Sequence, residues 1–215
     1  MEKYISQALQ KALNEKKVFI FDFDGTLAST NEILFQTLKK LCTKYGHTYT
    51  REEFDSLRGK PAKDYFEQFK SFVSVPVETN TLVEEYLKTF DEIMETQELK
   101  CYEYVKEIIK LFPDKTYCVA SNNAKKFLEQ RLKEFGFEKQ FTYIFDCGTG
   151  ELSKQMLYAN TEKFVNANPS DCVLFEDTQK YLDAGKECGL SCVGIVHKDK
   201  PLSADYLINL SSEED

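Results

Sequence analysis

Short apolar runs separated by stretches of helical periodicity constrain the fold of this chain more than any other feature of its sequence. The runs are VFIF (18–21), TYCVA (116–120), TYIF (142–145), CVLF (172–175) and CVGIV (192–196). They are rich in β-branched and aromatic residues and show little polar alternation. This pattern favours strands that are buried on both faces, as in a parallel sheet.

Helical patterns lie between these runs and define the fold class. Helices are expected over 103–112, over 125–135, after residue 151 and over about 179–188. Pro113, Gly136 and Gly189 follow three of them, and these residue types commonly end helices. Alternation of strand and helix predicts an α/β protein with a doubly wound parallel sheet, a Rossmann-like core with right-handed crossovers.

One long stretch interrupts this alternation. Residues 28–95 contain no convincing strand but several amphipathic helical patterns, such as ILFQTLKKLCTKYG and TLVEEYLKTFDEIME. That is more chain than a crossover between two strands needs. We therefore predict two domains, a core formed by 1–27 and 96–215 and a helical insertion formed by 28–95.

Composition and charge indicate which partners and which cellular compartment to expect. A net charge of −8 argues against general attraction to nucleic acid, which needs a basic surface. No apolar run approaches membrane-spanning length, and the N-terminal segment has no signal-peptide pattern. The seven cysteines lack zinc-ligand spacing and fit reduced thiols, so we expect a cytoplasmic protein. The oligomeric state stays open.

Polar residues directly after the apolar runs are the candidate site. Ligands of an open α/β sheet bind beyond the carboxyl ends of its strands. The residues there are Asp22, Asp24 and Thr26 after the first run, Ser121 and Asn122 after the second, and Glu176 and Asp177 after the fourth. Clustered carboxylates repel one another unless a cation joins them. Oxygen ligands favour Mg²⁺ over zinc, so a magnesium cofactor is predicted.

These motifs carry a resemblance to a known family. DFDGTL (22–27) resembles the signature of the haloacid dehalogenase-like hydrolase superfamily, and VASNN (119–123), Lys154 and LFEDTQKYLDAGKECGL (174–190) follow in the order of its later motifs. The resemblance spans the core, and residues 28–95 lie where many members insert a helical cap. It implies a phosphatase of the capped branch, which also contains β-phosphoglucomutases, acting on a small phosphorylated metabolite through an aspartyl-phosphate.

The resemblance also implies roles for the acidic residues. Asp22 would be the nucleophile and a metal ligand, and Asp24 would first protonate the leaving oxygen and then activate water. The backbone carbonyl of Asp24 and the side chain of Asp177 would complete the metal site. Glu176 would bind the metal directly or through water.

Four further core residues receive roles from the same resemblance. Ser121 and Asn122 would hold the transferring phosphoryl oxygens, and Lys154 would neutralise charge on the nucleophile Asp22 and on the phosphoryl group. Lys163 is a poorer candidate for that lysine, although Gln155 stands where the family usually has proline. Thr26 would orient the aspartates by hydrogen bonding and line the substrate site.

The insertion offers a basic segment, LRGKPAKDYF, which contains Arg58, Lys60 and Lys63. It resembles the cap loop that faces the active site in related enzymes, so Arg58 and Lys60 are candidate substrate-binding residues. A solvated basic stretch before a helix is an equal alternative. His47 and His197 have no evident partner in the sequence and receive no role.

Two other functions share these motifs. A phosphosugar mutase uses the same residues, and a non-catalytic phosphate- or partner-binding protein can retain the same scaffold. Intact Asp22, Asp24 and Asp177 argue against the second. A dehalogenase is disfavoured because its chemistry needs neither Asp24 nor a metal site.

Overall fold

The computed structural model describes residues 4–57, 62–73, 77–94, 97–148, 152–197 and 201–210. The chain divides into two compact units, one formed by Met1–Ala28 with Cys101–Asp215 and the other by Ser29–Lys100. The sequence analysis placed the two divisions after residues 27 and 95. Within the described ranges, no helix is both long and apolar enough to cross a membrane.

The first unit contains a six-stranded sheet. Its strands are β1 (Val18–Phe21), β2 (Thr116–Ser121), β3 (Phe141–Asp146), β4 (Cys172–Glu176), β5 (Ser191–Val196) and β6 (Tyr206–Asn209), arranged in the order β3-β2-β1-β4-β5-β6. Every neighbouring pair is parallel, which confirms the predicted doubly wound α/β core. The sequence analysis missed β6, because this edge strand buries only Ile208 of its four residues.

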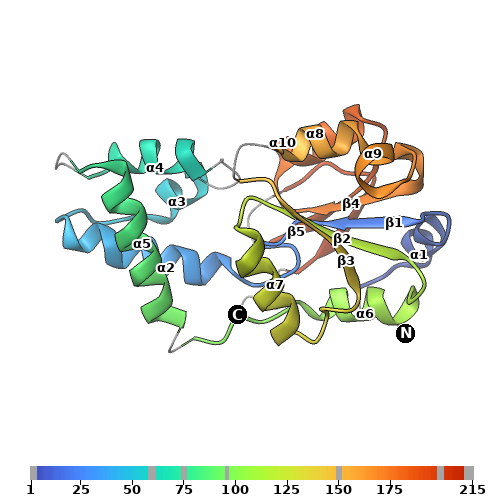
Figure 1. Cartoon of the computed structure of the whole chain (residues 1–215), viewed down its shortest axis with the longest axis horizontal. Coiled ribbons are helices and arrows are strands. Elements are labelled where there is room, and N and C mark those ends of the chain that lie inside the picture. The colour runs from blue at the N-terminus through green and yellow to red at the C-terminus, as the bar shows by residue number, and fades with distance from the viewer. Residues whose placement is uncertain are drawn as a thin grey trace. The chain divides into compact units, whose positions relative to one another are not determined.

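Helices cover both faces of this sheet (Figure 1). They are α1 (Gln7–Asn14), α6 (Glu103–Leu111), α7 (Lys125–Glu134), α8 (Lys154–Ala159), α9 (Thr161–Val165) and α10 (Gln179–Glu187), with a 3₁₀ turn η1 (Pro169–Asp171). In both views α8, α9 and α10 lie on one side of the sheet, and α6 and α7 lie on the other. The segment expected to form one helix after residue 151 forms two, since α8 ends at Ala159, α9 begins at Thr161, and Asn160 caps both.

The core is built from the two faces of the central strands. On one face Val18 and Ile20 of β1 belong to an apolar cluster with Leu157 and Leu182 from the helices. On the other face the rings of Phe21 and Phe175 stack with centroids 4.2 Å apart. Burial on both faces stabilises β1 and β4. Polar residues therefore occur only at and after the carboxyl ends of these two strands.

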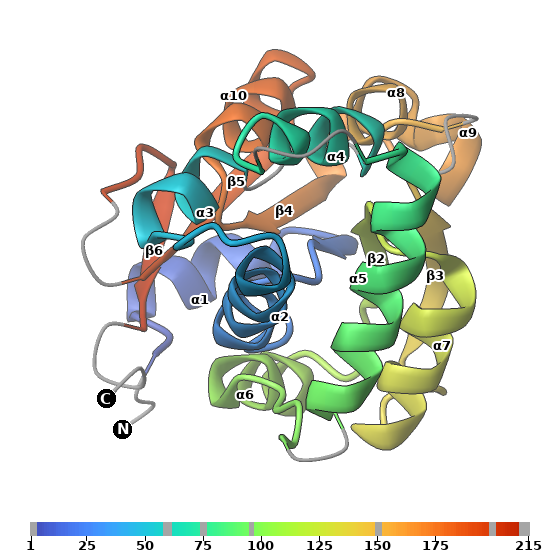
Figure 2. The same cartoon turned by 90° about the vertical axis from the view of Figure 1, so that its left-hand side faces the viewer.

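The second unit is helical. In the part of it that the structure describes, the regular elements are α2 (Asn31–Lys44), α3 (Arg51–Leu57), α4 (Ala62–Lys70) and α5 (Thr79–Met94), and Figure 2 shows α2 nearly end-on. Leu38, Leu41, Phe54, Phe69 and Leu82 form its buried core. Lys40 and Glu92 join α2 to α5 at 2.7 Å on the surface.

Candidate active site

The topology of the sheet marks one place for a ligand. From β1 the chain runs outward to β2 and β3 on one side, and it then returns to β4 and continues to β5 and β6 on the other. Open α/β sheets bind ligands at such a switch point, beyond the carboxyl ends of the strands. Asp22 directly follows β1, while Glu176 ends β4 and Asp177 follows it.

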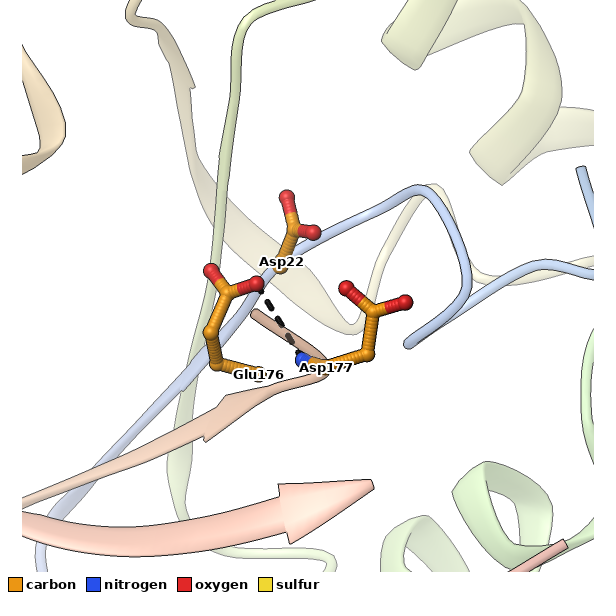
Figure 3. Close-up of side chains that lie close together, drawn as sticks. All are labelled: Asp22, Glu176 and Asp177. Atoms are coloured by element: carbon orange, nitrogen blue, oxygen red, sulfur yellow. Dashed lines mark hydrogen bonds between the residues drawn. The ribbon is translucent and has the colours of Figure 1, made fainter. Parts of the chain in front are cut away.

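Three carboxylates meet at this point (Figure 3). Asp22, Glu176 and Asp177 each place an oxygen within 4.8 Å of the other two. All three are buried, with exposed fractions of 6%, 0% and 2% respectively. The ladder between the strands fixes their spacing, because the backbone N–H of Asp22 donates to the carbonyl of Phe175 at 3.0 Å.

Lys154 joins this cluster from the first turn of α8. Its ammonium donates to Oδ1 of Asp22 at 2.6 Å and to Oε2 of Glu176 at 2.9 Å, and the side chain is 3% exposed. The hydroxyl of Ser153 accepts from the backbone N–H of Met156 at 3.1 Å, and this cap starts the helix at Lys154. Lys163, the other candidate, is exposed.

Burial and charge together shift the pKa values of the cluster. Burial, followed by repulsion from Asp22, raises the pKa of Glu176 well above its ordinary value. Burial also raises the pKa of Asp22, although Lys154 opposes this effect. For Lys154 burial alone would lower the pKa, but Asp22 and Glu176 outweigh it and the pKa rises. The lysine therefore stays charged, while the two acids resist full ionisation without further positive charge.

A divalent cation fits this donor set. Three carboxyl groups face a single ammonium, so full ionisation of the buried cluster would leave an excess of negative charge that a cation can balance. The ligands are all oxygens, which suits hard cations such as Mg²⁺. Both oxygens of Glu176 already accept hydrogen bonds, Oε2 from Lys154 and Oε1 from the backbone N–H groups of Asp177 and Thr178 at 3.1 Å.

Asp24 lies on the turn beyond Asp22 and contacts the loop after β2. Its Oδ2 accepts from Nδ2 of Asn123 at 2.5 Å. The same amide group and the backbone N–H of Asn123 both donate to Oγ of Ser121 at 3.2 Å. Asn123 therefore links Asp24 to the buried Ser121, a connection that the sequence analysis did not predict.

Asn122 contacts two neighbouring elements. Its Nδ2 donates to the hydroxyl of Tyr181 at 3.4 Å, and the ring of Tyr181 lies 4.4 Å below the ammonium of Lys154. The loop after β3 also lies close to the backbone of Asn122. A Cβ atom added to Gly148 in this loop would lie 2.0 Å from the backbone oxygen of Asn122. Only glycine fits at position 148.

This close approach leads to a stability and activity prediction. Gly148→Ala should push the Asn122 backbone away and lower the free energy of unfolding by about 1–3 kcal/mol. It should also lower kcat/KM about ten- to a hundredfold, because Ser121 and Asn123 move with that backbone. Urea unfolding and steady-state kinetics measure both effects.

Gly136→Ala is the matched control. Gly136 has a φ of 77° and no atom within 4 Å of an added Cβ, so the change strains the backbone without a clash. It should cost about 1–2 kcal/mol and leave kinetics unchanged. Equal kinetics of wild type and Gly148→Ala would show that the contact has no bearing on the site.

Thr26 lies on the turn after Asp24. Its side chain is fully buried and its hydroxyl makes no hydrogen bond to a described residue, and its expected role in orienting the aspartates and binding substrate stays a prediction. The turn at Gly25, with a φ of 72°, folds the segment back so that Leu27 donates to the carbonyl of Phe23. The hydroxyl of Tyr104 donates to the backbone carbonyl of Thr26 at 2.6 Å, so this turn is held through its backbone and not through the Thr26 side chain.

Most of the basic segment expected to contact substrate falls outside the described ranges. Arg58 and Lys60 lie outside the described residues, and the side chain of Lys63 does as well. Their proposed substrate contacts stay predictions.

Two residues of this sheet edge were missed from sequence. His197 is the first residue after β5, and Asp146 ends β3. Asp146 accepts from the backbone N–H groups of Gly148 at 3.0 Å and Lys125 at 3.2 Å, and so joins the loop after β3 to the start of α7. The rule that identified Asp22, Ser121 and Glu176, polar residues at strand ends, also selects these two when it is applied to every run.

The fold and the site define a doubly wound α/β protein with an acidic cluster and a lysine at the switch point of its sheet. A family model described as haloacid dehalogenase-like hydrolase matches residues 19–195. The chain belongs to this family, which confirms the resemblance seen in its motifs.

Individual relatives are distant but cover most of the chain. A phosphorylated carbohydrates phosphatase of Thermotoga maritima is 25% identical over 198 residues, spanning 83% of this chain and 84% of the relative. The fold of CbbY from Rhodobacter sphaeroides, solved in complex with phosphate, matches with a TM-score of 0.74 at 20% identity, over 90% of this chain and 93% of that one. A β-phosphoglucomutase from Clostridium difficile matches with a TM-score of 0.73 at 19% identity, over 93% of each chain.

Proposed function

We propose that this protein is a magnesium-dependent phosphatase that hydrolyses a small phosphorylated metabolite through an aspartyl-phosphate on Asp22. The observation that carries the proposal is the buried cluster of Asp22, Glu176 and Asp177, with Lys154 bonded to the first two. The similarity to a phosphatase of phosphorylated carbohydrates supports the substrate class.

In the first step Asp22 attacks phosphorus. A carboxylate oxygen of Asp22 forms a bond to phosphorus as the bond to the leaving oxygen breaks, and Asp24 gives its proton to that oxygen. Lys154, 2.6 Å from Asp22, balances negative charge that builds up on the phosphoryl group. Ser121 and Asn122 hold the phosphoryl oxygens.

In the second step Asp24 acts as the base. Its carboxylate takes a proton from a water molecule, the water oxygen bonds to phosphorus, and the bond between Asp22 and phosphorus breaks. Inorganic phosphate leaves, and both aspartates return to their starting protonation states. The hydrogen bond from Asn123 keeps the Asp24 carboxylate on the Ser121 side of the site throughout.

Asp22, Asp177 and the backbone carbonyl of Asp24 would hold Mg²⁺, which supplies Lewis-acid charge to the phosphoryl oxygens. Glu176 would bind the ion directly or through water, and its Oε2 also accepts from Lys154 at 2.9 Å. Asp22 would then serve the ion and the phosphoryl group as well as Lys154, with which it already forms an ion pair.

A stoichiometry assay tests the function. With nitrophenyl phosphate and Mg²⁺ we expect steady turnover, with one phosphate released for each phenol, and no turnover in excess EDTA. A panel of sugar phosphates and other phosphorylated metabolites then identifies the substrate from phosphate release.

The same assay separates the two alternatives. A mutase protects its phosphoaspartate from water, so hexose phosphate would be isomerised faster than phosphate appears. A non-catalytic binding protein would release neither phenol nor phosphate from any substrate. Either result contradicts the phosphatase proposal.

A further inference from the structure

His197 is a buried histidine at the edge of the sheet that carries the acidic cluster. It directly follows β5, which is the parallel neighbour of β4, so it lies beside the residues that end β4. Its side chain is only 5% exposed, and no role in the proposed phosphoryl transfer is assigned to it.

The imidazole of His197 has three neighbours, which are Gly25, Asp177 and Tyr102. Its Nε2 lies 2.6 Å from the carbonyl oxygen of Gly25. The same nitrogen is 3.6 Å from Oδ2 of Asp177, which is packing contact rather than a hydrogen bond. The ring of Tyr102 lies with its centroid 5.8 Å away.

The contact with Gly25 fixes the state of the imidazole. A carbonyl oxygen can only accept, so Nε2 carries the hydrogen and donates it. Gly25 is the residue whose left-handed backbone turns the chain after Asp24. His197, which directly follows β5, therefore holds the backbone of that turn by donating to the Gly25 carbonyl. The same ring packs against the Asp177 carboxylate.

We propose that His197 is a positioning residue that holds the Asp24–Gly25 turn against Asp177 and thereby sets the geometry of the divalent-cation site. The inference rests on the proposed function, in which Asp177 and the Asp24 carbonyl are ligands. Groups that orient ligands without touching the ion commonly change metal affinity ten- to a hundredfold.

Calorimetric titration of the whole protein with Mg²⁺ alone, without substrate, tests the proposal independently of turnover. His197→Leu removes the donor and should weaken Mg²⁺ binding about ten- to a hundredfold. His197→Gln keeps an amide donor near the position of Nε2 and should weaken it less than about threefold. Thermal unfolding in EDTA reports whether either variant has lost general stability.

His47→Gln provides the matched control. His47 contacts Glu53 at 2.8 Å within the second unit, so its replacement should leave Mg²⁺ affinity unchanged. Equal Mg²⁺ affinity of wild type and His197→Leu overturns the positioning role alone. Equal weakening in His197→Leu and His197→Gln also overturns it, because the donor would then not matter. Wild-type protein that binds no Mg²⁺ contradicts the proposed function, and the role of His197 falls with it.

Discussion

Asp22→Asn is expected to lower kcat by at least about a thousandfold while leaving the protein folded. The change removes the proposed nucleophile and one proposed ligand but keeps a side-chain oxygen that can accept from Lys154, whose ammonium lies 2.6 Å from Oδ1 of Asp22 in the wild type. Because it also removes one of three clustered carboxylates, it should raise the stability of the metal-free protein. Steady-state kinetics and urea unfolding in EDTA measure the two effects.

Asp183→Asn is the control for this variant. Asp183 is an exposed carboxylate on α10 that accepts from Gln179 at 2.7 Å, and its replacement should change neither activity nor metal-free stability. Retention of wild-type turnover by Asp22→Asn would falsify the covalent mechanism. A lower metal-free stability would instead contradict the electrostatic description of the cluster.

Lys154→Met is expected to have the largest effect on stability. It leaves Asp22 and Glu176 buried without their ammonium partner, and removal of one member of a buried ion pair costs about 3–5 kcal/mol. Activity should fall by at least about a hundredfold, since the charge that balances the phosphoryl group is lost. Urea unfolding in EDTA and in saturating Mg²⁺ measures the stability, and Mg²⁺ should recover part of the loss.

Lys163→Met separates this effect from the loss of any lysine in the region. Lys163 is exposed on α9, so its replacement should be close to neutral in stability and kinetics. If the two variants lose the same stability, the buried contacts of Lys154 contribute nothing of their own.

Much of the core was predictable because a strand buried on both faces has a short, uninterrupted apolar sequence. The runs at 18–21 and 172–175 became β1 and β4, and polar residues after them became the acidic cluster. The strand β6 has no such apolar run. It buries only Ile208 and forms because β5 offers it a paired edge, which is a property of the sheet and not of the segment.

Contacts between distant parts of the chain were the least predictable. Lys154 and Asp22 are separated by 132 positions, and His197 and Gly25 by 172. No local periodicity reports whether two such side chains meet, and only the family resemblance led us to expect Lys154 beside the nucleophile. The place of Thr26 in its motif predicted a role, but it did not indicate that the hydroxyl is fully buried and bonds to no described residue.

The sequence by itself determined the strand and helix types, the parallel sheet and the residues able to perform chemistry at its edge. These properties follow from periodicity and residue type, which act over a few neighbours. Only the tertiary structure decided that Lys154 bridges Asp22 and Glu176, that Asn123 holds Asp24, and that position 148 must be glycine. Those outcomes depend on how separate loops pack at the ends of the strands, where a shift of an ångström makes or breaks a contact.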